Sequence, residues 1–437
     1  MDTKAHYKRK IMEIEKIGIL GGGISGLTLQ RELRERSHVL EKSDKPGGLC
    51  RTFWKDGFGY DIGGHILFSK NQTINDYVDA LLGANAGQQR RANTVLYKGK
   101  YLKYPFENDL AKLGPEECYE CLIDYLNSDY PKPTNFEGWM YYTFGKSIAE
   151  KYLIPYNRKI WKTEPSSMNV EWVERIPKPP KEDVIKSAVG LSTEGYTHQL
   201  HFRYPINGGA EALVTAVQTG LVTTNCNITS IKKIKEGWKV QTQDSEYTFE
   251  DIVINFPIHR AVKCFENVPQ NVTDAINALR YTTIRVVLIA VNNKSLLDKS
   301  AIYIPDPEIL PHRLCYMGYF SRKLVKPGTS SLIAEITAMP NSDIDNMSNQ
   351  EIIDRTVSDL SRINVIDPAT IITTDLVKCE FGYPVYDLKY RENVTTMREY
   401  FQSIDVKLLG RFAEFEYINS DECIRRAIVM ATQINTL

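Results

Sequence analysis

The strongest constraint on this 437-residue chain is a glycine-rich turn near its N-terminus. An apolar run leads into the sequence GGGISG, and a second apolar run ends at Glu41. Gly21, Gly23 and Gly26 occupy the three positions of a strand–turn–helix dinucleotide fingerprint. Because these residues lack Cβ atoms, backbone N–H groups and the positive end of a helix can approach a pyrophosphate. Glu41 stands where a carboxylate accepts hydrogen bonds from ribose hydroxyls. The segment therefore predicts a βαβ unit that binds a dinucleotide.

Length and composition limit the class of protein. At roughly 150 residues per domain, the chain is long enough for two or three domains with a large core. Its 54 basic and 54 acidic side chains cancel, so nothing favours nucleic acid or an anionic membrane as a partner. No apolar stretch approaches the roughly 18 residues of a membrane span, and residues 1–15 are polar rather than signal-like. We therefore expect a soluble, cytoplasmic protein.

The cysteine and histidine pairs do not make a convincing metal site. Eight cysteines are scattered along the chain, which is typical of reduced, mostly buried thiols rather than of a disulfide framework. Cys118-x-x-Cys121 has no second pair nearby, and His198-x-x-His201 has no acidic or thiol companions. We expect structural roles for both pairs and no metal.

The remaining chain is organised in segments. Residues 75–189 are aromatic-rich and helical in pattern, with 119–126 spaced for one apolar helix face. Short β-rich runs separated by turn residues indicate an antiparallel sheet; they are Arg285–Val291, Ala301–Ile304, Tyr316–Phe320 and Leu332–Ile336. We predict an α/β fold with three parts: a discontinuous Rossmann-like FAD-binding domain (12–74, 190–265 and 380–437), a helical insertion for substrate and lid (75–189) and an antiparallel β-sheet domain (266–379).

Two further glycine pairs follow the fingerprint. Gly48 ends one pair and is followed by Arg51, whereas Gly64 ends the other and is followed by His65. Paired glycines let the backbone come close to a bulky ligand, and an arginine can neutralise a diphosphate. We interpret both segments as flavin-binding loops, with ordinary glycine turns as the alternative.

Taken together, these segments resemble the FAD-dependent superfamily of the flavin amine oxidases, protoporphyrinogen oxidase and UDP-galactopyranose mutase. Motifs farther along are similar to those of the UDP-galactopyranose mutase family. They are GGHILFS at 63–69, YPFEN at 104–108, YLIPYNRKIW at 152–161, HRLCY at 312–316, GYPV at 382–385 and GRFAEFEY at 410–417. Several matches in the right order are more specific than any single one.

The resemblance implies FAD, active in its reduced form, as the cofactor. His65 would lie beside the isoalloxazine ring and tune its edge. The full set of implied cofactor contacts is Gly21, Gly23, Gly26, Glu41, Gly48, Arg51, Gly64, His65, Gly410 and Arg411.

The resemblance also implies a nucleotide-sugar substrate. Arg175 and Arg313 would clamp its diphosphate with charge-assisted hydrogen bonds, and Trp161 would lie near the uridine. Arg175 falls in the segment 162–180, which we expect to act as a mobile lid. The other implied substrate contacts are Tyr104, Asn108, Tyr156, Tyr383, Tyr417 and Asn419; the implied catalytic set is His65, Arg175, Arg313, Tyr383 and Tyr417.

The implied reaction converts a UDP-hexopyranose, UDP-galactopyranose or a related sugar, to the furanose. In the family's chemistry, N5 of reduced FAD attacks the anomeric carbon, a flavin–sugar adduct forms, and the ring recloses through another hydroxyl without net redox. An external reductant such as NAD(P)H is compatible with this scheme. The galactofuranose product would serve cell-surface polysaccharide biosynthesis.

Departures from the family pattern leave the sugar open. Asn419 stands where bacterial members commonly carry a carboxylate, and extra charged residues flank Trp161. An amino, uronic or deoxy sugar therefore remains open, as does the oligomeric state. A flavin-dependent oxidase or dehydrogenase of the amine oxidase type is the main alternative, and a non-catalytic flavoprotein is a third.

Overall fold

The computed structural model describes residues 15–194, 200–292 and 299–436, so His198 lies outside the described residues. The chain divides into two compact units. The first unit comprises 1–51, 213–279 and 391–437, and the second comprises 52–212 and 280–390. Each unit is described by itself below. The three-part division expected from the sequence stays a prediction.

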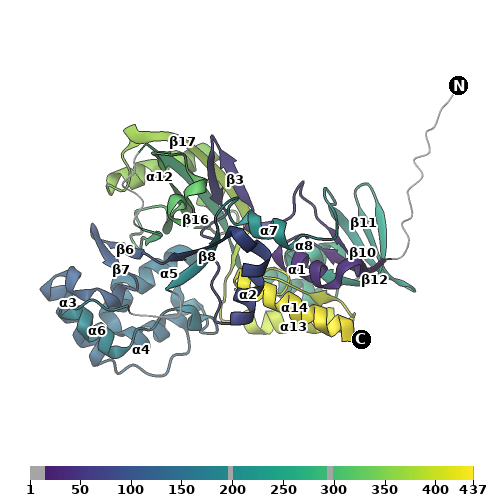
Figure 1. Cartoon of the computed structure of the whole chain (residues 1–437). Helices are drawn as coiled ribbons and strands as arrows, with labels where there is room; N and C mark the ends of the chain where they lie inside the picture. Colours follow the sequence, from purple (N-terminus) through teal and green to yellow (C-terminus); the bar gives the residue numbers. More distant parts are fainter. Residues whose placement is uncertain (1–14, 195–199, 293–298, 437) are drawn as a thin grey trace. The chain divides into compact units, whose positions relative to one another are not determined.

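A seven-stranded sheet forms the centre of the first unit, and the half that carries the glycine fingerprint is parallel. Strand β1 pairs in parallel with both β2 and β12, so that Ile19 lies between Val39 and Val253, all three fully buried. Parallel strands covered on both faces need such continuous apolar runs. Figure 1 shows the sheet beside the helices of this unit, and its strands are β1 (Glu15–Leu20), β2 (Ser37–Leu40), β9 (Leu221–Thr223), β10 (Ile228–Ile234), β11 (Gly237–Thr242), β12 (Glu246–Ile254) and β18 (Lys407–Leu408).

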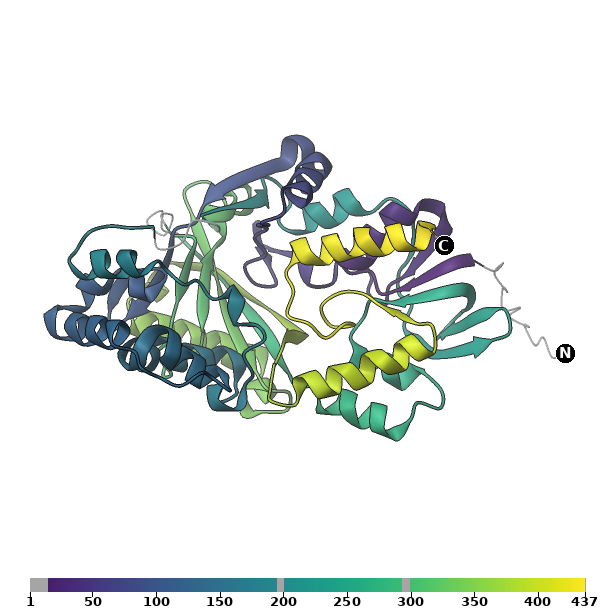
Figure 2. The same cartoon turned by 90° about the horizontal axis from the view of Figure 1, so that it is seen from below.

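Helices from distant parts of the chain cover this sheet. Helix α1 (Ile24–Leu33) makes the crossover from β1 to β2 and packs against α14 (Ser420–Thr436). The buried residues of α14 recur at helical spacing, from Cys423 and Ile424 to Ala427, Ala431 and Ile434. In Figure 2 the loop that precedes α14 runs between this helix and α13 (Tyr390–Ser403). These features confirm the predicted α/β fold with a Rossmann-like domain.

The second unit is built on a mainly antiparallel sheet of seven strands. Among the residues that the structure describes, only β14 and β6 pair in parallel within it. Helix α12 (Asn349–Arg362) covers one face with an apolar core that includes Leu314, Ala334 and Ile336. Side chains alternate along a strand, so Arg313 and Glu335 point to the opposite face. The strands are β6 (Asn93–Tyr97), β7 (Lys100–Lys103), β13 (Tyr281–Val291), β14 (Ala301–Tyr303), β15 (Arg313–Tyr316), β16 (Ser330–Ala338) and β17 (Ile371–Pro384).

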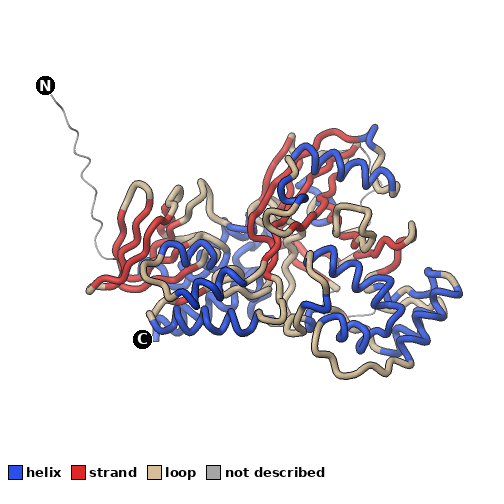
Figure 3. Tube along the Cα trace, turned by 180° about the vertical axis from the view of Figure 1, so that it is seen from behind, coloured by secondary structure: helices blue, strands red, loops and turns tan. Residues whose placement is uncertain are grey.

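A group of helices makes up much of the remaining second unit. Figure 3 shows these helices gathered to one side of the strands, and they are α3 (Pro115–Leu126), α4 (Phe136–Ile148), α5 (Ile154–Trp161) and α6 (Lys181–Ala188). The same stretch of chain also contributes β5 (Ala86–Arg90), β6 and β7, which its helical pattern did not indicate. Strand β5 carries little apolar patterning, and its backbone pairs with β8 (His201–Pro205).

One of the expected strands is wrong. The run Tyr316–Phe320 was expected to be extended, but β15 ends at Tyr316 and Met317–Phe320 forms the short helix α10. Aromatic residues fit a strand or a helix equally when their rings are buried, so tertiary packing decides. Here Phe320 packs edge-on against Phe202 at 5.4 Å and tilted against Tyr204 at 5.3 Å.

The described residues also bear on the cysteines and on membrane insertion. The eight cysteines all lie within the described ranges and form no disulfide there, and six of them are buried. Within the ranges described, no helix has both the length and the apolar character needed to cross a bilayer.

Glu107 of the second unit carries a buried carboxyl group. It is 1% exposed, and its Oε2 atom has no hydrogen-bond partner among the described residues. Burial raises the pKa of Glu107 to about 8, because the charged form loses its hydration.

We predict that this group makes the protein less stable as pH rises. An unfolded glutamate ionises near its ordinary value of 4.5, whereas Glu107 stays protonated in the folded state until about pH 8. The folded state therefore holds the extra proton in between, and the free energy of unfolding falls as pH rises across that window. Glu107→Gln should remove this loss, as measured by chemical denaturation from pH 4.5 to 8.5. The exposed Glu116→Gln is the control, and parallel curves for wild type and Glu107→Gln would contradict the prediction.

Candidate functional site

The fingerprint turn of the first unit leaves no room for side chains. Gly21 has φ +111°, and a Cβ on it would lie 2.8 Å from the backbone carbon of Asn255. A Cβ on Gly26 would lie 2.6 Å from the carbonyl oxygen of Gly21. Helix α1 begins directly after Gly23, which offers no side-chain cap. The backbone geometry therefore fits a cradle for a pyrophosphate at the helix N-terminus.

Glu41 is locked in place by the backbone that surrounds it. Its Oε2 accepts the N–H of Gly22 at 2.7 Å and its Oε1 accepts the N–H of Ser43 at 2.8 Å. Each carboxylate oxygen has two lone pairs, so Glu41 can still accept a further hydrogen bond from a ribose hydroxyl. These contacts fix the orientation of the carboxylate at the end of β2.

The loop that contains Gly48 and Arg51 lies against the fingerprint. Gly47 donates its N–H to Gly22 at 2.7 Å, and a Cβ on Gly48, whose φ is +55°, would lie 3.3 Å from the Cα of Gly23. Arg51 lies 3.5 Å from Asp44 in the same loop. Gly64 and His65 belong to the second unit and are described there.

Asn255 is a residue that the sequence analysis missed. Its Oδ1 accepts the N–H of Gly26 at 3.0 Å, and its Nδ2 donates to the carbonyl of Leu409 at 2.6 Å. It thereby caps the first turn of α1 from another strand and ties that turn to the loop that starts at Gly410. A polar residue directly after the apolar end of β12 is the signal that could have found it, because ligands bind beyond the carboxyl ends of such strands.

The loop around Gly410 and Arg411 is also tightly fixed. Gly410 has φ +95° and donates its N–H to Glu414 at 2.8 Å. Arg411 donates to the carbonyl of Ile418 at 2.8 Å, and its guanidinium lies 5.4 Å from the ring centre of Tyr417. Asn419 follows directly and accepts the N–H of Cys423 at the start of α14.

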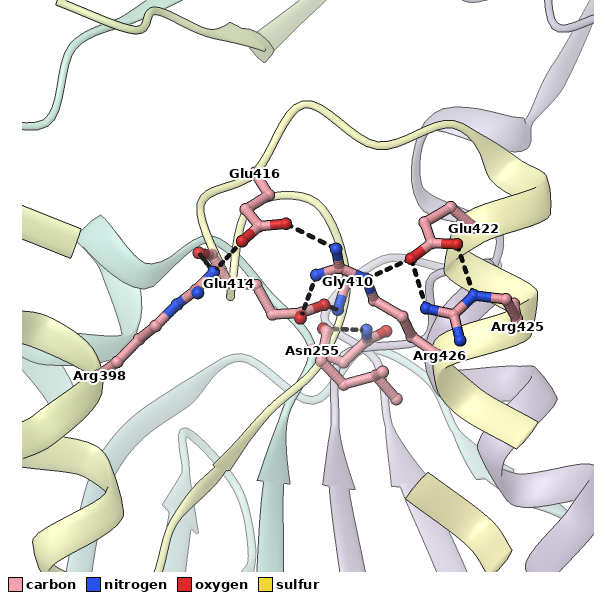
Figure 4. Close-up of polar contacts among 9 residues, drawn as sticks. Asn255, Arg398, Gly410, Glu414, Glu416, Glu422, Arg425 and Arg426 are labelled. Carbon is pink, nitrogen blue, oxygen red and sulfur yellow. Dashed lines mark hydrogen bonds and ion pairs between the residues drawn. The ribbon is translucent and has the colours of Figure 1, made fainter. Parts of the chain in front are cut away.

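A network of charged side chains holds this loop to helix α14 (Figure 4). Arg426 contacts Glu414 and Glu416 at 2.6 Å each and Glu422 at 2.8 Å. Arg398 from α13 adds a second contact to Glu416, and Arg425 pairs with Glu422. Three carboxylates thus converge on one guanidinium, so the loop is fixed by partly buried charges.

Asn255→Ala should weaken cofactor retention without unfolding the protein. The change frees the N–H of Gly26 and the carbonyl of Leu409, so the cradle and the Gly410 loop are no longer linked. The flavin-to-protein absorbance ratio after gel filtration measures retention. Asn435→Ala, at an exposed position of α14, is the control. Equal flavin content in Asn255→Ala and wild type would show that this link does not shape the cofactor site.

Two neighbouring arginines should differ sharply in their effect on stability. Arg426→Ala leaves Glu414 and Glu416 without their shared partner in partly buried positions, and we expect it to cost about 3 kcal/mol. Arg425 is more exposed and pairs with Glu422 three positions earlier in the chain, so Arg425→Ala should cost about 0–1 kcal/mol. Urea denaturation of both variants measures the difference. Similar losses in the two variants would contradict the proposed importance of Arg426.

Aromatic rings from several elements of the second unit meet in one cluster. Tyr104 stacks on Tyr303 at 4.6 Å, and Tyr156 meets the same ring edge-on at 5.5 Å. Burial raises the pKa of Tyr156 well above its ordinary value, and the positive charge of Arg313 opposes that shift. Tyr383 also interacts electrostatically with Arg313. The structure thus brings four of the predicted substrate residues together: Tyr104, Tyr156, Arg313 and Tyr383.

Trp161 packs at the end of α5 beside this cluster. Its ring lies 5.9 Å from that of Tyr383 and 4.8 Å from that of Trp172. Its indole N–H donates to Asn157 at 3.0 Å, so the polar edge of the ring is already satisfied. Trp161 is 3% exposed, which leaves little of its surface to solvent.

Asn108 and Arg175 make other contacts than the residues of the aromatic cluster. Asn108 is buried, and its amide exchanges hydrogen bonds with Thr193. Arg175 ends a single helical turn, Val173–Arg175. The chain just before this turn is anchored, because Asn169 donates its N–H to Tyr386 at 2.9 Å and Met168 is fully buried. The first half of the expected lid is therefore packed into the second unit.

Glu335 is the second residue that the sequence analysis missed. It is fully buried and accepts two hydrogen bonds from Arg313, at 2.9 and 2.6 Å. It also accepts the N–H of Gly64 at 3.1 Å, and His65 continues the same turn with its N–H donated to Gly63. No local motif marks Glu335, since it sits within an otherwise apolar strand.

Comparison with known proteins identifies the family. The sequence model described as "Flavin containing amine oxidoreductase" matches residues 179–398, and that of an NAD(P)-binding Rossmann-like domain matches residues 19–81. The chain belongs to the flavin-containing amine oxidoreductase family.

The chain is also similar to UDP-galactopyranose mutases. It is 26% identical over 178 residues to a probable UDP-galactopyranose mutase of Klebsiella pneumoniae and 25% identical over 158 residues to the UDP-galactopyranose mutase of Mycoplasma pneumoniae. These matches cover 38% and 33% of this chain, but only 46% and 39% of the two relatives.

A crystal structure of reduced UDP-galactopyranose mutase shares the fold. It is 23% identical, has a TM-score of 0.88, and the match covers 97% of this chain and 96% of that one. The comparisons confirm the resemblance that the motifs indicated. The family name also agrees with a flavin as the dinucleotide for the cradle in the first unit.

Proposed function

We propose that this protein is a FAD-dependent nucleotide-sugar mutase, which converts a UDP-hexopyranose to the furanose without net redox. UDP-galactopyranose or a related sugar is the substrate. The observation that carries the proposal is the cluster around Arg313, where a fixed guanidinium lies among tyrosines and near Trp161. Such a set suits a nucleotide diphosphate, which needs charge-assisted donors beside flat apolar surfaces. The similarity to UDP-galactopyranose mutases supports the same substrate class.

The proposed roles follow from the chemistry of each side chain. Arg313 uses two nitrogens on Glu335, so its Nη1 is the atom directed to the diphosphate. Arg175 supplies a second set of donors as the sugar–phosphate bond lengthens. Tyr383 donates its phenolic hydrogen to the same phosphates, and Tyr417, in the first unit, is assigned the same role by resemblance.

The cofactor has a separate set of proposed contacts. The cradle at Gly21–Gly26, together with Glu41, Arg51 and Arg411, would hold FAD. When bound and reduced, the flavin supplies a nucleophile for the anomeric carbon. His65 is proposed to lie at its edge, on the turn that Glu335 fixes. The protein's own task is then to orient the sugar and to keep the departed diphosphate in place for its return.

A flavin-dependent oxidase is the second candidate. The family match over residues 179–398 favours it, because that family is defined by amine oxidoreductases. An oxidase consumes an electron acceptor on every turnover and has no need of a diphosphate clamp. The Arg313 cluster therefore makes the mutase the better-supported candidate.

A product assay should separate these two candidates. Dithionite-reduced protein is incubated with UDP-galactopyranose and a panel of other UDP-sugars, and the products are identified by NMR. We expect a furanose product with no stoichiometric loss of reductant, and NAD(P)H can replace dithionite in a parallel reaction. An oxidised product, with oxygen consumed once per turnover, would instead establish the oxidase.

Replacing either clamp arginine by alanine should abolish most activity while FAD stays bound. Each loss leaves a desolvated diphosphate short of a charged donor, which we expect to lower kcat/KM by about 100-fold or more. Flavin content by absorbance confirms that the cofactor site is intact in Arg175→Ala and Arg313→Ala. Arg322→Ala, at an exposed position of the second unit, is the control. Wild-type rates in both arginine variants would contradict the proposed diphosphate clamp.

A further inference from the structure

Glu335 stands where two proposed parts of the active site meet. Arg313 on β15 and Glu335 on β16 are direct cross-strand partners, and both side chains lie on the face away from α12. The guanidinium and the carboxylate form a bidentate pair at 2.9 and 2.6 Å. Glu335 is fully buried, whereas the Arg313 side chain is 22% exposed. The arginine is therefore the partner that can still reach a ligand.

The same carboxylate also shapes the turn that carries His65. Besides Arg313, it accepts the N–H of Gly64 at 3.1 Å and the thiol of Cys315 at 3.4 Å. Gly63 has φ +90°, and a Cβ on it would lie 3.3 Å from Oε2 of Glu335. The Gly63–His65 turn is thus folded directly onto the Glu335 carboxylate.

The charge of this pair has a consequence for ligand binding. A carboxylate with a bidentate arginine makes a unit with no net charge. His312 adds no positive charge, because burial lowers its pKa well below the ordinary value and keeps the ring neutral. Arg313 can therefore offer a directed N–H group to a diphosphate, but its net attraction for an anion is largely cancelled by Glu335.

We propose that Glu335 is a positioning residue: it fixes the orientation of Arg313 and of the His65 turn, and its charge weakens nucleotide binding. This inference rests on the proposed function, because it takes the diphosphate as the ligand of Arg313. The charge of Glu335 weakens the attraction of Arg313 for the diphosphate, whereas its two hydrogen bonds hold the guanidinium in the orientation that meets the charge developing on the leaving group. Glu335 thus lowers affinity while it fixes the orientation of Arg313.

The test is a substitution of similar shape that removes the charge and replaces one acceptor oxygen by a donor amide. In Glu335→Gln, the Arg313 charge is no longer cancelled, so UDP should bind about tenfold more tightly at low salt. The dissociation constant should also rise more steeply with salt than in wild type, because the binding of UDP then includes a net electrostatic attraction that salt screens. In steady state, KM should fall with the dissociation constant, and kcat should also fall, because the amide has one acceptor oxygen fewer and orients Arg313 less well.

Two further variants separate charge from geometry. Glu335→Asp keeps the charge but shortens the side chain, so it should impair turnover without tightening UDP binding. Asp345→Asn removes a carboxylate that pairs with the buried Arg285 of β13 in the same unit, and it should leave UDP affinity unchanged. Titration with UDP, followed by flavin absorbance and by calorimetry, gives the dissociation constants.

The outcomes discriminate clearly. Unchanged or weaker UDP binding in Glu335→Gln would overturn the proposal, as would equal tightening in Glu335→Asp. In an Arg313→Ala background, the effect of Glu335→Gln should vanish. If Arg313→Ala itself leaves UDP affinity unchanged, the diphosphate clamp fails, and with it the proposed function rather than the role of Glu335 alone.

Discussion

The first unit depends on the close approach of the fingerprint turn to the end of β12. A methyl group at Gly21 or Gly26 would collide with Asn255 or with the turn itself. That absence of side chains brings Asn255 within hydrogen-bond distance of Gly26 and lets it reach Leu409 as well. Three segments that are distant in sequence are therefore held at one end of the parallel sheet. The position of the Gly410 loop follows from this contact, whereas Glu41 is held by Gly22 and Ser43.

Buried carboxylates play a comparable part in the second unit. Asp61 is fully buried and accepts hydrogen bonds from Thr52, Tyr204 and Ala210. Burial raises its pKa to about 6, although these donors favour the charged form. Glu335 is equally buried but has a guanidinium as its partner. A buried acid with several donors from separate strands specifies how those strands must align, because an unpaired alternative would be costly. Both residues thus fix local geometry through their full set of partners.

The sequence predicted features that depend on neighbours along the chain and missed those that depend on distant ones. The fingerprint glycines and Glu41 form one short unit, so a short stretch of sequence is enough to recognise their pattern. Asn255 acts on Gly26 across 229 positions, and Glu335 acts on Gly64 across 271. No periodicity carries that information. The resemblance to a family located Arg313 but not its counter-charge, because Glu335 interrupts an apolar strand without any accompanying motif. The misassigned run Tyr316–Phe320 failed for a related reason, since its rings find their partners in Phe202 and Tyr204.

The way in which α14 holds the Gly410 loop has a consequence for the order of events during synthesis. The fingerprint emerges from the ribosome well before β12 and Asn255, which follow more than two hundred residues later. Arg426, which gathers Glu414 and Glu416, comes later still. In a nascent chain, the glycine turn is thus present long before the residues that bind to it in the folded unit. The link between the glycine turn and the Gly410 loop can therefore form only after Asn255 and Leu409 have both been synthesised.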